Sequence, residues 1–243
     1  MFELTEKQKE IISSRARIKL VMGGMRSGKT STALLNLEEI IKRNNGDALY
    51  LVNSENISRC IQRKIKEHFS VISYKILGSD KTVRFKTKYG NIYVSTDYES
   101  HYITNIDFRV ITMDNSTSNK FFNEHFRSLN DDECLINEID TSMYLTGHIP
   151  EDKENNFYKL WIKYCFIDNA NCKSFRISTW DNPSMSDKKE DYKRKLISSL
   201  GLQKYLRQYE CVPDYTEPYV AREYLNDLLK SSQISLEDYK FRI

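Results

Sequence analysis

The chain has 243 residues and a formal net charge of +3, with 40% hydrophobic and 29% charged residues. This composition excludes a largely disordered chain and is typical of a globular protein with a polar surface. The small net charge excludes a global basic field, so any contact with nucleic acid would depend on local clusters of Lys and Arg.

Cysteine usage and apolar runs indicate the compartment. The chain has 5 cysteines, an odd number, and none are spaced as Cys-x-x-Cys, which argues against a disulfide framework and a zinc site and suits a reducing cytosol. No apolar run approaches the roughly 20 residues that span a bilayer. The charged N-terminus also lacks the apolar core of a signal peptide. We expect a protein that works inside a cell, with no membrane partner.

The first quarter of the chain alternates between strand and helix patterns. An apolar run predicts a strand over 17–22, and helical spacing of apolar residues predicts a helix over 29–43. A second buried strand over 48–52 and an amphipathic helix over 57–69 follow. This β-α-β-α order is typical of a parallel sheet, so the predicted fold class is α/β.

Further along the chain, alternating residues between Val83 and Ser95 predict a β-hairpin that turns at 88–90. From 187 onward the pattern is mostly helical, and Pro213 to Pro218 suggest a linker before a C-terminal helix. Between these regions the sequence predicts strands over 108–113, 143–146 and 174–179, and helices over 121–129 and 155–164.

The segment Gly23 to Thr30 reads Gly-Gly-Met-Arg-Ser-Gly-Lys-Thr and completes the pattern Gly-x-x-x-x-Gly-Lys-[Ser/Thr], the Walker A motif. It follows a predicted strand and opens a predicted helix, where backbone N–H groups and the positive helix end can hold phosphate oxygens. We therefore expect ATP to bind here, with Lys29 at the β- and γ-phosphates and Thr30 as a ligand of Mg²⁺. A glycine turn that only caps a helix is the alternative.

A carboxylate at the end of a neighbouring strand would complete the magnesium site. Asp114 closes the apolar strand over 108–113 and is the Walker B candidate; a strand-ending turn residue is the alternative. The next residue is Asn115, which can hydrogen-bond a water but cannot accept its proton. Hydrolysis would then be slow, or another acid supplies the base; the candidates are Glu124, Glu133 and Glu138, each of which also fits a solvated surface acid.

Taken together and in order, these residues resemble the ATPase domain of the large terminase subunit, the motor that packages DNA into tailed-virus proheads. The resemblance covers most of the chain. Its landmarks are Leu4-Thr5-x-x-Gln8, the segment Gly23 to Thr30, Asp114, Thr146-Gly147-His148-Ile149-Pro150, Ser178-Thr179-Trp180-Asp181-Asn182-Pro183, and 203–212.

The fold implied by this resemblance is a P-loop NTPase of the ASCE type. It has a mainly parallel central sheet flanked by helices, an inserted β-hairpin and a small helical C-terminal extension. We place the ATPase core at 1–185 and the helical extension at 186–243.

The resemblance also implies roles for single residues. Gln8 would read the adenine edge, Arg26 would reach the γ-phosphate, and Thr146 with Gly147 would couple phosphate release to movement. A surface glutamine, a solvated loop cation and a simple turn are the respective alternatives. The expected catalytic residues are Lys29, Arg26, Asp114 and Asn115, and the expected nucleotide-binding residues are Gln8, Gly23, Gly24, Met25, Arg26, Ser27, Gly28, Lys29, Thr30 and Ser31.

Further implied partners are double-stranded DNA, the portal protein, the small terminase subunit and a homo-oligomeric ring, in the host cell cytoplasm. Arg127 is a weak candidate for an arginine supplied to a neighbouring subunit. The segment 180–183 is expected to be structural. A basic stretch fits either DNA phosphates or a solvated helix face; it comprises Lys188, Lys189, Lys193, Arg194, Lys195, Lys204 and Arg207.

The chain departs from the family by ending about where a nuclease domain would begin, so no nuclease activity is expected. An excised piece, half of a split gene and a shortened relative all remain open. Asn115 also keeps open a second function, a nucleotide-dependent binding or regulatory module with degenerate hydrolysis. A helicase or another translocase is a third alternative, for which no second motor lobe is present.

Overall fold

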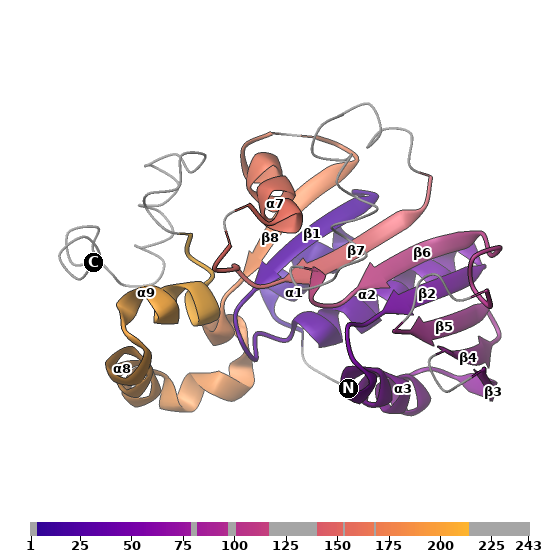
Figure 1. The fold of residues 1–243 in the computed structure, drawn as a ribbon, viewed down its shortest axis with the longest axis horizontal. Helices are drawn as coiled ribbons and strands as arrows, with labels where there is room; N and C mark the ends of the chain where they lie inside the picture. The colour runs from indigo at the N-terminus through magenta and orange to yellow at the C-terminus, as the bar shows by residue number, and fades with distance from the viewer. Residues whose placement is uncertain are drawn as a thin grey trace.

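The computed structural model describes residues 4–78, 82–96, 101–116, 140–152, 154–167 and 169–213. Within these residues the chain forms an eight-stranded sheet with the order β3-β4-β5-β2-β6-β7-β1-β8. Figure 1 shows this sheet with helices on both of its faces. The predicted α/β fold with a mainly parallel sheet is therefore confirmed.

Parallel pairing joins six neighbouring strands and sets the position of the Walker motifs. The strand β1 (Ile18–Gly23) lies between β7 (Ser142–Gly147) and the edge strand β8 (Cys172–Ile177). Beyond β7 come β6 (Phe108–Met113), β2 (Asp47–Leu51) and β5 (Asn91–Ser95), all parallel. The carboxyl ends of β1, β7 and β6 consequently meet at one edge, where ligands bind in open α/β sheets.

The predicted hairpin is confirmed as β4 (Thr82–Thr87) and β5, and it extends the central sheet because β5 pairs with β2. A further strand, β3 (Val71–Leu77), pairs antiparallel with β4 and was not predicted. Its apolar side chains remain exposed, with Ile72 63%, Tyr74 55% and Ile76 49% exposed. The strand thus carries apolar residues at alternating positions that it does not bury.

Two helical layers cover the sheet. On one face lie α1 (Glu6–Ser13), α2 (Lys29–Asn44) and α3 (Glu55–His68), whose apolar residues share a buried cluster with Val21, Tyr50 and Phe85. On the other face α7 (Asn156–Phe166) packs against β8 and β1 and buries Trp161, whose Nε1 donates to the Phe175 carbonyl at 2.9 Å. Side-chain caps fix the helix starts, since Thr5, Ser54 and Asn155 each accept a bond from a backbone N–H of the first turn.

The C-terminal part of the described chain is helical, as predicted from 187 onward. It contains the short turns η2 (Thr179–Asp181) and η3 (Pro183–Lys188), then α8 (Lys189–Leu200), α9 (Leu202–Tyr205) and the π-helical turn η4 (Leu206–Glu210). Figure 1 shows α8 and α9 beyond the β8 end of the sheet. The predicted helix over 121–129 and the expected C-terminal helix lie outside the described residues. The domain boundary at 185 stays a prediction.

A buried lysine lies between β1 and α2. The Lys19 side chain is 3% exposed, and its ammonium donates to Asn36 Oδ1 at 2.7 Å and to the Ile12 carbonyl at 3.2 Å. Burial lowers the pKa of Lys19 from 10.5 to about 8, and Arg43 lowers it further while Glu39 opposes the shift. Below that pKa the folded chain keeps a charged ammonium in an apolar layer, which lowers the stability of the fold.

We expect the unfolding free energy to gain about 2 kcal/mol from Lys19 between about pH 7.5 and 9.5, because the unfolded chain binds its proton more tightly than the folded chain. Urea unfolding of the wild type and of Lys19→Met at both pH values isolates this contribution, since the methionine does not titrate. Equal pH dependence in the two proteins would show that the ammonium is not destabilised by burial.

Candidate nucleotide-binding site

The Walker A segment forms the loop between β1 and α2. Gly28 occupies the position before the first helical residue with φ 90°, a conformation that favours glycine. Arg26, on the same loop, also has a positive φ of 60°. The backbone therefore turns sharply across the sheet edge and brings the N-terminus of α2 toward the loop.

Lys29 folds back over its own loop. Its ammonium donates to the carbonyl oxygens of Gly23 at 2.6 Å and Gly24 at 2.8 Å. A Cβ added to Gly23 would lie 2.4 Å from Lys29 Cγ, so glycine is needed for this close packing. Burial lowers the pKa of Lys29, whereas Cys211 and Asp114 favour its charged form. The lysine nitrogen is thus held directly at the cradle.

Asp114 accepts hydrogen bonds from two other elements of the site. Its side chain is 7% exposed, and Oδ2 accepts a bond from Thr30 Oγ1 at 2.8 Å while Oδ1 accepts one from Thr146 Oγ1 at 2.8 Å. Tyr50 OH lies 3.4 Å from Oδ2. Burial, with Asp114 and Tyr144 adding to it, raises the pKa of Tyr50 well above its ordinary value, so the phenol stays a donor. The structure thereby brings Asp114, Thr30 and Thr146 together.

This donor set fits Mg²⁺. A hydroxyl oxygen and a carboxylate oxygen lie 2.8 Å apart, and Mg²⁺ in phosphate-binding sites takes one or two protein oxygens together with waters and substrate phosphates. No group of three His, Cys, Asp or Glu side chains that could hold a metal ion occurs within the described ranges. Thr30 and Asp114 are therefore suited to a metal shared with a phosphate chain.

Thr146 also connects the Walker B segment to the strand beside the loop. Its Oγ1 accepts a bond from the Asn115 N–H at 3.2 Å, and Asn115 has a positive φ of 59°. Gly147 pairs with Met22, one residue before the loop. Next comes His148, to which the sequence analysis gave no role of its own; burial and the charge of Lys29 lower its pKa. Strand pairing and the Thr146 hydroxyl thus link β1, β7 and the end of β6.

Gln8 lies beside the loop but has a local task. Its side-chain Oε1 accepts the Thr5 N–H at 3.0 Å and its own N–H donates to Thr5 Oγ1 at 3.2 Å, which forms a capping box at α1. A Cβ added to Gly28 would lie 2.7 Å from Gln8 Nε2. The predicted contact with adenine stays a prediction, and the amide is in reach of the loop.

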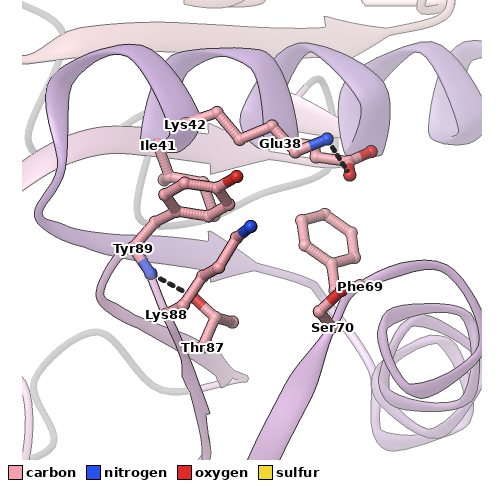
Figure 2. A pocket seen from close by; sticks show the side chains of 8 residues that line it. All are labelled: Glu38, Ile41, Lys42, Phe69, Ser70, Thr87, Lys88 and Tyr89. Carbon is pink, nitrogen blue, oxygen red and sulfur yellow. Dashed lines mark hydrogen bonds and ion pairs between the residues drawn. The ribbon is translucent and has the colours of Figure 1, made fainter.

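Two hollows border α2. One, of about 810 Å³, runs from Ser31 past Leu34 and Leu35 toward Phe69, with Lys64 Nζ 3.4 Å from Ser31 Oγ. A smaller cavity of about 150 Å³ lies between α2 and the β4–β5 turn. Figure 2 shows Lys88 and Tyr89 of that turn pointing toward α2, opposite the Lys42–Glu38 ion pair. Only the larger hollow reaches a predicted nucleotide-binding residue.

The outer side of the loop is bound by residues of the landmarks 178–183 and 203–212, to which the sequence analysis assigned no contact with the loop. Thr179 Oγ1 donates to the Met25 carbonyl at 2.6 Å and Asn182 Nδ2 donates to the Arg26 carbonyl at 2.7 Å. The Met25 N–H donates to the Gln208 carbonyl at 2.7 Å. Asn and Thr after a strand are common turn residues, so their sequence carries no signal for this contact.

One expectation about the basic stretch is wrong. Lys193 is 7% exposed and lies 3.4 Å from the carboxylate of Glu210, so it is neither a solvated residue nor free for DNA phosphates. The buried carboxylate is the physical reason, because it can compensate an ammonium that is removed from water. Arg194, Lys195 and Lys204 are exposed, as expected. The base candidates Glu124, Glu133 and Glu138, and Arg127, lie outside the described residues.

A search of the described helices finds none long and apolar enough to cross a membrane. The sequence matches no protein-family model and no curated protein.

Known structures share the fold. The large terminase ATPase domain of Thermus phage P74-26 is similar with a TM-score of 0.60 and 13% identity over 86% of this chain and 93% of that one. The large terminase of the thermophilic bacteriophage D6E, in complex with ADP, has a TM-score of 0.60 and 15% identity over 85% of this chain. The HK97 bacteriophage large terminase has a TM-score of 0.51 and 10% identity over 99% of this chain.

This chain spans 52% of the D6E protein and 50% of the HK97 protein, about half of either length. The structural neighbours are thus phage large terminases and a terminase ATPase domain, as the sequence motifs suggested. At these identities the likeness establishes the fold, and function is argued from the site.

Proposed function

We propose that this chain binds Mg-ATP at the Walker A loop and hydrolyses it as a motor domain for packaging double-stranded viral DNA into proheads. The observation that carries the proposal is the bonded set Thr30–Asp114–Thr146 beside Lys29. It joins the loop, the Walker B strand and the strand between them. A structurally similar terminase binds ADP, which supports a nucleotide at this edge of the sheet.

Each residue has a distinct task in this proposal. Lys29 leaves the Gly23 and Gly24 carbonyls to bind the β- and γ-phosphates, while the loop N–H groups hold their oxygens. Thr30 and Asp114 hold Mg²⁺, which neutralises charge on the phosphate oxygens when bound. Arg26, exposed on the loop, approaches the γ-phosphate. Asn115 hydrogen-bonds the attacking water, and Gln8 contacts the adenine.

The partners of this proposed motor are proposals as well. They are double-stranded DNA, the portal protein, the small terminase subunit and further copies of this chain in a homo-oligomeric ring, in the host cell cytoplasm. Thr146 and Gly147 couple the site to movement, because the Thr146 hydroxyl contacts both Asp114 and the Asn115 backbone.

Steady-state phosphate release with Mg²⁺, measured with and without double-stranded DNA, tests the proposal. A motor domain turns ATP over above a Lys29→Ala control, and DNA raises the rate. Turnover equal to that of the control would contradict the proposed motor function. Nucleotide binding without turnover would instead favour the second candidate, a nucleotide-dependent binding or regulatory module.

Asn115 is the observation that favours this second candidate, since an amide cannot take the proton of the attacking water. If hydrolysis is degenerate, Asn115→Glu raises turnover about 100-fold or more, within the range of general-base catalysis. If another base already serves, we expect Asn115→Glu to leave turnover unchanged or reduce it, because a second carboxylate beside Asp114 adds like charge. The measured quantity is kcat for Mg-ATP, with Asn56→Glu, at an exposed position in the first turn of α3, as the control substitution.

A further inference from the structure

We infer that Glu210 is a positioning residue for the phosphate-binding loop, acting through the segments η2 and η4. This inference rests on the proposed nucleotide site and extends it to a carboxylate in the segment 203–212, to which the sequence analysis assigned no role. Glu210 closes η4 and is 2% exposed.

The first step is the attachment of the loop. Gly24 donates its N–H to the Ile177 carbonyl at 2.9 Å, and Met25 donates its N–H to the Gln208 carbonyl at 2.7 Å. A Cβ added to Gly24 would lie 2.1 Å from the Tyr209 carbonyl oxygen, which shows how closely η4 approaches. Together with the bonds from Thr179 and Asn182, these contacts hold the backbone of residues 24–26 from outside.

The second step is the connection between those two supporting segments. One Glu210 oxygen, Oε2, accepts a bond from Ser178 Oγ at 2.9 Å, and Ser178 is also the N-cap of η2. The other oxygen, Oε1, accepts a bond from Tyr205 OH at 2.6 Å and lies 3.4 Å from Lys193 Nζ. The carboxylate therefore joins η2, α9 and α8 at one buried point.

Aromatic contacts close the cluster. Trp180 Nε1 donates to Tyr205 OH at 3.0 Å, and the Lys193 ammonium lies 5.3 Å from the centre of the Trp180 ring. Burial, with Glu210 adding to it, raises the pKa of Tyr205, so its phenol stays protonated and keeps donating. Loss of the Glu210 charge would leave the Lys193 charge buried without its partner, which weakens the whole cluster.

The consequence concerns the loop that carries Arg26 and Lys29. If η2 and η4 separate, the N–H of Met25 and the carbonyls of Met25 and Arg26 lose their partners together. The loop then samples conformations in which the phosphate cradle is not formed. The apparent affinity for nucleotide falls in proportion to the fraction of molecules whose loop is still formed.

Hydrogen exchange of the full chain, read by mass spectrometry on a peptide that covers 23–31, tests the inference without requiring activity. We expect Glu210→Gln to speed exchange of the Gly24 and Met25 amides about tenfold or more, because local opening becomes easier. The matched control is Glu67→Gln, which removes an exposed carboxylate 3.9 Å from Arg63 and should leave the loop unchanged.

Faster exchange confined to 202–212, with the loop as protected as in the wild type, would overturn the inference. The second readout is the KM for Mg-ATP, which should rise about tenfold in Glu210→Gln, measured well below the unfolding temperature of the variant. A wild type without turnover would refute the proposed motor and leave the exchange result to decide the role of Glu210.

Discussion

Replacing Lys29 with alanine is expected to lower kcat/KM for Mg-ATP at least about 100-fold, because preorganised cationic donors at a reacting phosphate typically contribute that much. The ammonium lies 2.6 and 2.8 Å from two loop carbonyls and is held close to Asp114.

The measurement is phosphate release over a range of ATP concentrations, with unfolding temperature recorded for each protein. Lys42→Ala is the matched control, since Lys42 lies on the same helix α2 in an ion pair with Glu38 and its side chain is 45% exposed. Lys29→Met keeps the packing of the aliphatic stem over Gly23 and should be as inactive as the alanine variant. A Lys29→Met protein with wild-type turnover would show that the charge is not used.

The second large effect is expected for Asp114→Asn. The amide keeps the size of the side chain and one acceptor oxygen, but it removes the charge that holds Mg²⁺ and replaces the other acceptor with a donor. Since Thr30 and Thr146 both donate to Asp114, one of these hydroxyls loses its acceptor. Turnover should fall about 100-fold or more, and nucleotide affinity should lose its dependence on Mg²⁺.

Magnesium titrations of nucleotide affinity separate this loss from general damage. Asp140→Asn is the control, because the Asp140 side chain is 94% exposed and lies 3.2 Å from the Arg17 guanidinium. If Asp114→Asn retains the magnesium dependence of the wild type, Asp114 is a strand-ending turn residue and not a metal ligand.

Much of the fold could be predicted from local patterns. The strand over 108–113 was located to the residue, and the strand, loop and helix around Gly23 to Thr30 follow the prediction within one residue. Continuous apolar runs mark the two strands, which are buried on both faces, and helical spacing after a glycine motif marks α2. The strand β3 was missed although Ile72, Tyr74 and Ile76 alternate at strand spacing, and these side chains remain exposed at the sheet edge.

The candidate site was predictable where a motif marks the residue. Lys29, Thr30, Asp114 and Thr146 were named in advance, and the structure brings them together. The hydrogen bonds that hold the loop from residues far along the chain were not predictable, because they depend on tertiary contacts. Asn182, for example, donates to the Arg26 carbonyl, 156 positions away.

The burial of Lys193 also could not be predicted from the charge pattern of the sequence. It belongs to a basic run in sequence, yet Glu210 draws it into a buried cluster with Trp180. Spacing along a helix cannot reveal a carboxylate that another segment brings to that face.

Calorimetric titration of the wild-type chain with a slowly hydrolysed ATP analogue, in the presence of Mg²⁺, tests the central claim of a nucleotide site at the Walker A loop. We expect one analogue per chain, with binding lost in Lys29→Ala and weakened when Mg²⁺ is removed. Absence of binding to the wild type, or equal binding by Lys29→Ala, would contradict a nucleotide site built on this loop.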